Sequence, residues 1–135
     1  MTLKPGNVLV HANGGRRLVP KLTDFGLATE LGRPRTPGKF SGSIPYLSPE
    51  SLLGLPLDGR TDLYGLGILL YQLATGEMPL RSRSADEILR WHRAGPPIDP
   101  ALVRPRLAPR LARFIRRISA RDPSRRPASA LEALS

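Results

Sequence analysis

The sequence contains no cysteine, few aromatic residues and no long apolar run. Without cysteine a disulfide framework and a thiolate zinc site are both excluded, and two histidines cannot build a metal cage by themselves. No segment approaches the roughly 20 apolar residues of a membrane span. The first residues, MTLKPGNVLV, lack the basic start and apolar run of a secretory signal. We therefore expect a soluble, cytoplasmic protein without a membrane span.

Acidic residues are also scarce. The chain has 11 Asp and Glu against 21 Lys and Arg, which gives a net charge of +10, and 18 of the 21 basic residues are arginine. This charge attracts nucleic acid, acidic membranes or acidic proteins. The basic residues are spread from Arg16 to Arg126 instead of clustering with aromatics, so we expect a solvated surface and no specific nucleic-acid partner. A basic nucleic-acid binder is an alternative that rests on net charge alone.

The chain length and the local patterns predict a single domain that is mainly α with a small β-hairpin. A length of 135 residues with 40% hydrophobic content suffices for one core. Val8–His11 and Leu18–Thr23 are short runs rich in Val and Leu, and the intervening Asn13, Gly14 and Gly15 indicate a hairpin. The segment from Leu31 to Pro49 is rich in Pro, Gly, Ser, Arg and Thr, which predicts a long loop.

The rest of the chain predicts helices. The boundary signals are a Ser-Pro-Glu start at position 48, Gly76 as a left-handed cap, and the capping-box pair Ser84 and Glu87. The expected helices run from about Ser48 to Gly54, from about Thr61 to Gly76, from Ser84 to Gly95, from Leu107 to Ile118 and from Ala128 to Leu134. The second of these is apolar on nearly all sides, so it should be the buried centre of the domain.

Three polar side chains should converge at one end of the hairpin. Lys4 and Asn7 precede its first strand and Asp24 follows its second, so antiparallel pairing brings them together. An amine, an amide oxygen and a carboxylate could hold a phosphate together with magnesium. Taken singly, each has a simpler interpretation: Lys4 as a surface charge, Asn7 as a turn residue, and Asp24 as a turn-starting acid.

Five motifs, in order along the chain, resemble the C-terminal lobe of a eukaryotic-type (Hanks-type) Ser/Thr protein kinase. LKPGNVLV resembles the end of the catalytic loop, DFG at Asp24–Gly26 the magnesium-binding triplet, and GSIPYLSPE at Gly42–Glu50 the end of the activation segment. DLYGLG at Asp62–Gly67 resembles the start of the central helix, and RDPSRRPAS at Arg121–Ser129 the last motif of the fold. The resemblance implies a partial kinase domain over 1–135. Its parts would be 1–26 (catalytic loop, hairpin and DFG), 27–50 (activation segment) and 51–135 (helical subdomain).

The resemblance also implies a role for each matching residue. Lys4 would stabilise the transferring phosphate, Asn7 and Asp24 would bind magnesium and hence ATP, and Phe25 and Gly26 would set the orientation of Asp24. The implied structural supports are Ser43 before the peptide-binding turn, a buried pair of Glu50 with Arg126, and Asp62, which would accept hydrogen bonds from the catalytic loop. Thr36 and Ser41 are candidate phosphorylation sites. The implied partner is a protein substrate.

Two departures from the family pattern predict that the chain alone is inactive. Thr2 stands where the family has its catalytic aspartate, and a neutral threonine cannot act as a carboxylate base. The glycine-rich loop and strand lysine of the N-lobe have no counterpart in these 135 residues, so a separately encoded N-lobe is a candidate partner. Two interpretations stay open: an inactive piece of a Ser/Thr kinase, or a non-catalytic, pseudokinase-like protein-binding module.

Overall fold

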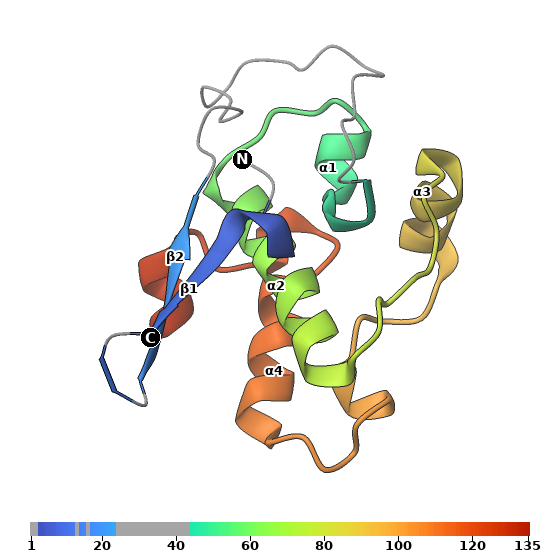
Figure 1. The fold of residues 1–135 in the computed structure, drawn as a ribbon. Helices are drawn as coiled ribbons and strands as arrows, with labels where there is room; N and C mark the ends of the chain where they lie inside the picture. The colour runs from blue at the N-terminus through green and yellow to red at the C-terminus, as the bar shows by residue number, and fades with distance from the viewer. Residues whose placement is uncertain (1–2, 13, 16, 24–43) are drawn as a thin grey trace.

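A two-stranded hairpin lies beside a helical body in the computed structural model, which describes residues 3–12, 14–15, 17–23 and 44–135 (Figure 1). The helices are α1 (Pro49–Leu52), α2 (Gly59–Thr75), α3 (Ala85–Ala94), α4 (Pro109–Ile118) and α5 (Ala130–Leu134). Four short 3-10 helices join them: η1 (Pro5–Asn7), η3 (Ile44–Tyr46), η4 (Pro100–Leu102) and η5 (Pro123–Arg125). The expected class, mainly α with a small β-hairpin, is confirmed.

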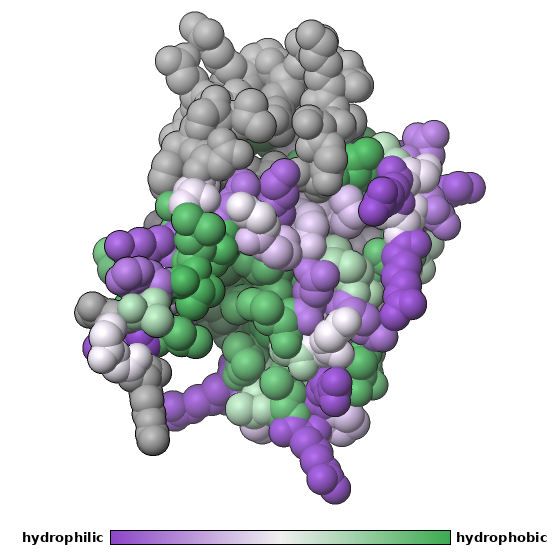
Figure 2. Space-filling model, viewed as in Figure 1, coloured by the Kyte–Doolittle hydropathy of each residue, from purple (hydrophilic) through white to green (hydrophobic). Residues whose placement is uncertain are grey.

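The hairpin pairs β1 (Val8–Ala12) with β2 (Leu18–Leu22) in an antiparallel register that runs from Val8↔Leu22 to Ala12↔Leu18. The predicted hairpin is therefore correct to within one residue at its ends. Gly14 in the connection has a φ of +52°, a conformation that glycine adopts without steric cost. Hydrophobic colour gathers over the hairpin side of the molecule, whereas the side that carries α3 is largely hydrophilic (Figure 2). The hairpin thus leaves apolar side chains in contact with solvent, among them Leu9, Val10 and Leu18.

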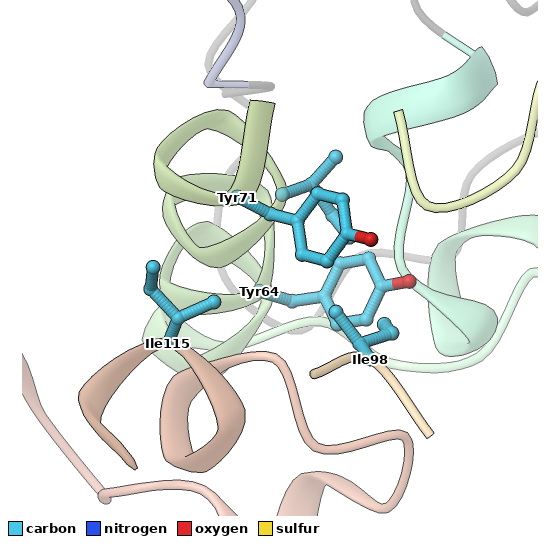
Figure 3. Close-up of a cluster of buried hydrophobic side chains, with 5 residues drawn as sticks. Tyr64, Tyr71, Ile98 and Ile115 are labelled. Atoms are coloured by element: carbon cyan, nitrogen blue, oxygen red, sulfur yellow. The ribbon is translucent and has the colours of Figure 1, made fainter. Parts of the chain in front are cut away.

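The central helix α2 forms the middle of the core, as its composition predicts. Its residues Tyr64, Ile68 and Tyr71 pack with Ile98 and with Ile115 of α4 (Figure 3). A second cluster on α2 joins Leu63 to Ile118 and Ala133. The helix ends at Gly76, which has a φ of +79° and donates its N–H to the carbonyl of Gln72 at 2.8 Å.

Three helices, α2, α4 and α5, begin two residues away from their expected starts, and capping explains the starts of α2 and α5. α2 begins two residues early because the Asp58 carboxylate accepts a hydrogen bond from the N–H of Arg60 at 2.8 Å. α5 begins two residues late because Ser129 caps it, accepting from the N–H of Glu132 at 3.1 Å.

The buried face of α4 does not follow the spacing of its large apolar residues. Ala112, Ile115 and Ile118 are buried, whereas Leu111 is 37% exposed and Leu107 lies before the helix begins. Positions three apart along one helix face one neighbour, and α2 is the neighbour here. The helices among the described residues fall short of the combined length and apolarity that a membrane crossing needs.

Candidate functional site

Lys4 and Asn7 lie at the open end of the hairpin. The N–H of Asn7 donates to the carbonyl of Lys4 at 2.9 Å, which closes the short helix η1. The carbonyl of Asn7 accepts from the N–H of Thr23 at 2.9 Å. Lys4 is half-buried and Asn7 is buried, with 6% of its surface exposed. The structure thus brings Lys4 and Asn7 to the end of the hairpin where β2 leaves the sheet.

This end of the hairpin is held against the first turns of α2. Leu3 is buried, and a Cβ placed on Gly65 would meet the N, Cβ and O atoms of Leu3 at 3.4 Å. Glycine at position 65 therefore lets the chain before η1 lie close to the helix. Asp62, one turn earlier on α2, is half-buried, and burial raises the pKa of its carboxyl above the ordinary value.

Several predicted site residues lie outside the described residues: Thr2, Asp24, Phe25, Gly26, Thr36, Ser41 and Ser43. Among the residues that are described, no three His, Cys, Asp or Glu side chains come together as a metal site. The candidate donors at the hairpin end are of a different kind, since Asn7 offers an amide oxygen. Amide and carboxylate oxygens suit a hard cation such as magnesium, so the chemistry of Asn7 with Asp24 fits that ion.

Glu50 and Arg126 form a buried bidentate ion pair, although they are far apart in sequence. Arg126 Nη1 donates to Glu50 Oε1 at 2.6 Å and Nη2 donates to Oε2 at 3.0 Å, and both residues are buried. Thr61 Oγ1 also donates to Glu50 Oε1, at 3.0 Å. Burial alone would raise the pKa of the Glu50 carboxyl, but the hydrogen bonds and charge of Arg126 outweigh it and lower the pKa.

The rest of the Arg126 guanidinium is also fully bonded. Nε donates to the carbonyl of Ala120 at 2.6 Å, Nη1 to that of Arg60 at 3.0 Å, and Nη2 to that of Arg121 at 3.1 Å. Its central carbon lies 4.9 Å from the ring centroid of Tyr64. Arg126 therefore ties α1, the start of α2 and the segment after α4 together.

An open groove of about 580 Å³ lies beside η3. Ile44, Pro45 and Tyr46 line one side of it, and Met78 with residues 80–83 line the other. The hydroxyl of Tyr46 donates to Gln72 Oε1 of α2 at 2.7 Å, which fixes the ring in the wall. An apolar wall with polar atoms near its edge suits an extended peptide.

The groove has little signature in the sequence. Arg81 and Arg83, which lie on its rim, are both exposed. The sequence signal for the groove is two arginines separated by one residue, in the short connection after Gly76. That signal is weak because single arginines in a connection are usually solvated.

Comparison with known proteins assigns the chain to a family. A family model described as the protein kinase domain matches residues 1–135. The chain is 39% identical over 95% of its length to serine/threonine-protein kinase pkn3 of Myxococcus xanthus, of which it covers 25%. It is 40% identical over 94% of its length to Pkn1 of the same organism, of which it covers 19%. It is also 45% identical over 75% of its length to PkaA of Streptomyces coelicolor, of which it covers 19%.

The chain thus spans about a quarter, or less, of the length of these three curated relatives. The family match covers the hairpin, the central helix and the Glu50–Arg126 pair alike. The chain therefore belongs to the eukaryotic-type (Hanks-type) Ser/Thr protein kinases, and its fold is that of the C-terminal lobe of the kinase domain.

Proposed function

We propose that this chain supplies the substrate-binding lobe of a cytoplasmic Ser/Thr protein kinase and does not transfer phosphate by itself. The family reaction moves the terminal phosphoryl group of ATP to a Ser or Thr hydroxyl of a protein. Residues 1–26 would form the catalytic loop, hairpin and DFG, residues 27–50 the activation segment, and residues 51–135 the helical support. The upper wall of the nucleotide site would come from an N-lobe, in the same protein or separately encoded.

The observation that carries the proposal is the end of the hairpin. Half-buried Lys4 and buried Asn7 lie within one turn of η1, and Asn7 is bonded to Thr23, the residue before Asp24 in the sequence. Lys4 would contact the transferring phosphate, while Asn7 and Asp24 would hold magnesium. Bound magnesium would neutralise phosphate charge.

Other residues would support and orient these groups. Phe25 and Gly26 would orient Asp24, and Ser43 would lead the chain into the peptide groove beside η3. Asp62 would steady the catalytic loop against α2. Phosphorylation of Thr36 or Ser41 would regulate access to the groove.

We attribute the inactivity of the chain alone to Thr2 and to the N-lobe motifs that these 135 residues do not contain. The hydroxyl of the substrate must lose its proton as it attacks, and a carboxylate at this position accepts or orients that proton in the family. Threonine is neutral and its hydroxyl is a very weak base. General acid–base catalysis contributes about 10²–10⁴-fold, so its loss alone removes most of the rate.

A chimaera tests the proposal with both lobes present. Residues 2–135 would replace the matching segment of pkn3 from Myxococcus xanthus, with either the native Thr2 or Thr2→Asp. We expect phosphoryl transfer from labelled ATP to casein to rise about 10²-fold or more in the Thr2→Asp form. Asp24→Asn added to that form should abolish the transfer. If a folded Thr2→Asp chimaera showed no transfer, the proposal that this lobe can support catalysis would be wrong. If the Thr2 and Thr2→Asp chimaeras were equally active, Thr2 would not be a cause of the inactivity.

The second candidate is a pseudokinase-like module that binds a protein partner without catalysis. Thr2 and the open groove beside η3 favour it, since the described residues that line the groove include neither Lys4 nor Asn7. This candidate predicts partner binding that is unchanged by ATP and magnesium. Binding that requires the nucleotide would instead favour the kinase interpretation.

A further inference from the structure

A second hollow, with four arginines in its lining, lies away from the kinase site. It has a volume of about 570 Å³ and lies between the connection before η4 and the segment that joins α4 to η5. Its cationic lining residues are Arg116, Arg117, Arg121 and Arg125. It shares no lining residue with the groove beside η3, and it includes neither Lys4 nor Asn7.

Arg121 is held rigidly in the wall of this hollow. Its Nη1 donates to the carbonyl of Gly95 at 2.9 Å and its Nη2 to that of Pro96 at 2.5 Å. Its guanidinium carbon lies 4.9 Å from the ring centroid of Trp91, and its Nε is buried without a hydrogen-bond partner in the described residues. A charge fixed by stacking loses little conformational entropy when it meets an anion.

Two of the other arginines are paired with an acidic residue beside the hollow. Arg116 pairs with Asp99 at 3.0 Å and Arg117 with Glu132 at 3.7 Å, and both arginine side chains are nearly half exposed. The Arg117–Glu132 pair is exposed on both sides and therefore weak, so a ligand carboxylate can compete for Arg117. The Arg116–Asp99 pair is stronger, because the Asp99 side chain is only 14% exposed. Arg125 is exposed at the rim.

One acidic residue, Asp122, lines the hollow. Its carboxylate accepts from the N–H of Ser124 at 2.9 Å and from the Ser124 hydroxyl at 2.7 Å. These hydrogen bonds lower its pKa, so it stays ionised near neutral pH. Among the described residues, the lining of the hollow thus carries four positive charges and one negative charge, and two further carboxylates, of Asp99 and Glu132, pair with Arg116 and Arg117 beside it.

We propose that this arginine hollow is a docking site for an acidic segment of a partner protein, with Asp and Glu side chains entering between the arginines. Charge complementarity selects an anionic occupant, and the guanidinium fork matches a carboxylate in two hydrogen bonds. Pro97, Ile98 and Ala120 in the wall provide contact for apolar residues of the same segment. A nucleic-acid backbone is disfavoured because it lacks such residues, and a phosphate dianion would be repelled by Asp122 more strongly than one carboxylate.

Fluorescence anisotropy with the intact chain tests the proposal without any phosphoryl transfer. The probe is a short labelled peptide of Asp, Glu and Leu, and its Asn, Gln and Leu counterpart is the neutral control. The hollow variant is Arg117→Gln/Arg125→Gln. The matched control is Arg106→Gln/Arg110→Gln, which removes the same charge from exposed positions that line neither groove.

We expect the hollow variant to lose about tenfold in affinity for the acidic peptide and the matched control less than about twofold. Asp122→Asn should bind the acidic peptide about two- to fivefold more tightly, a gain that misfolding cannot imitate. Equal losses in the two double variants, or no gain in Asp122→Asn, would overturn the proposal. The proposal would also be overturned if a DNA duplex bound more tightly than the peptide and only the hollow variant lost that binding. The hollow would then be a nucleic-acid site.

Discussion

At the scale of single residues, Arg126 is the most strongly constrained side chain that the structure describes. Its five N–H groups make five hydrogen bonds, two to Glu50 and three to backbone carbonyls. Arg126→Lys keeps the charge but offers three donors from one nitrogen, so it leaves buried acceptors unpaired. We predict a loss of about 3 kcal/mol in the free energy of unfolding, measured by urea denaturation.

The neighbouring residue provides the control for this prediction. Arg125 is exposed, so Arg125→Lys should change the free energy of unfolding by less than about 0.5 kcal/mol. If Arg126→Lys cost as little stability as Arg125→Lys, a positive charge at position 126 would be sufficient and the geometry of the guanidinium fork would not matter.

Only part of this residue-level detail could be predicted from the sequence. The pairing of Glu50 with Arg126 came from the family resemblance, because no local spacing links two residues so far apart. The contact of Tyr64 with His92, at 3.3 Å between hydroxyl and Nε2, has no signature in either segment. The four arginines of the hollow lie within residues 116–125, but the sequence does not show that Pro97 and Ile98 fold against this stretch to complete the wall.

At the scale of elements, the approach of α4 to α2 depends on Gly67. A Cβ at this position would lie 2.7 Å from Ser119 Cβ, 3.1 Å from Ser119 N and 3.2 Å from Ile118 Cγ1. Alanine is the better helix former by about 1 kcal/mol, yet the steric clash involves backbone and buried atoms that cannot move freely. We predict that Gly67→Ala lowers the free energy of unfolding by about 1–3 kcal/mol, measured by thermal and urea denaturation.

Gly59, in the same helix, provides a control that distinguishes a steric clash at Gly67 from an effect of helix propensity. A Cβ on Gly59 would meet no atom within 4 Å, so Gly59→Ala should be neutral or slightly stabilising. If Gly67→Ala stabilised the protein as well, the close packing of α4 on α2 would not limit this position.

The elements themselves were mostly predictable, because their boundaries carry local signals. Gly76, Ser48 and Ser84 mark ends that the structure reproduces. The misplaced starts of α2 and α5 depend on whether a side chain folds back onto the helix or turns to solvent. The face of α4 was less predictable, since Leu111 has the right spacing but Ala112 fits closer to α2.

At the scale of the whole molecule, folding creates a buried polar centre around His92. The ring of His92 lies edge-on to Tyr64, and its Nε2 meets the Tyr64 hydroxyl at 3.3 Å. The charged groups that act on it are Arg121, Arg126 and Glu50. Burial, reinforced by Arg121, lowers the pKa of His92 from 6.5 to about 4.

This shift predicts that the protein loses stability in mild acid. The unfolded chain, with a histidine pKa of about 6.5, binds the proton first, so the contribution of His92 is complete above that pH and is lost as the pH falls toward about 4. The lowered pKa of Glu50 acts in the same direction at still lower pH. We expect the free energy of unfolding from urea titrations to fall by about 1–2 kcal/mol between about pH 7 and about pH 5.

Two histidine variants assign this loss to its source. His92→Gln should flatten the pH dependence in that window, because glutamine does not titrate. His11→Gln is the matched control, because His11 is exposed on β1, and we expect the pH dependence to survive this substitution. A slope that survived His92→Gln would place the proton uptake elsewhere, and a slope removed by His11→Gln would locate it at the hairpin.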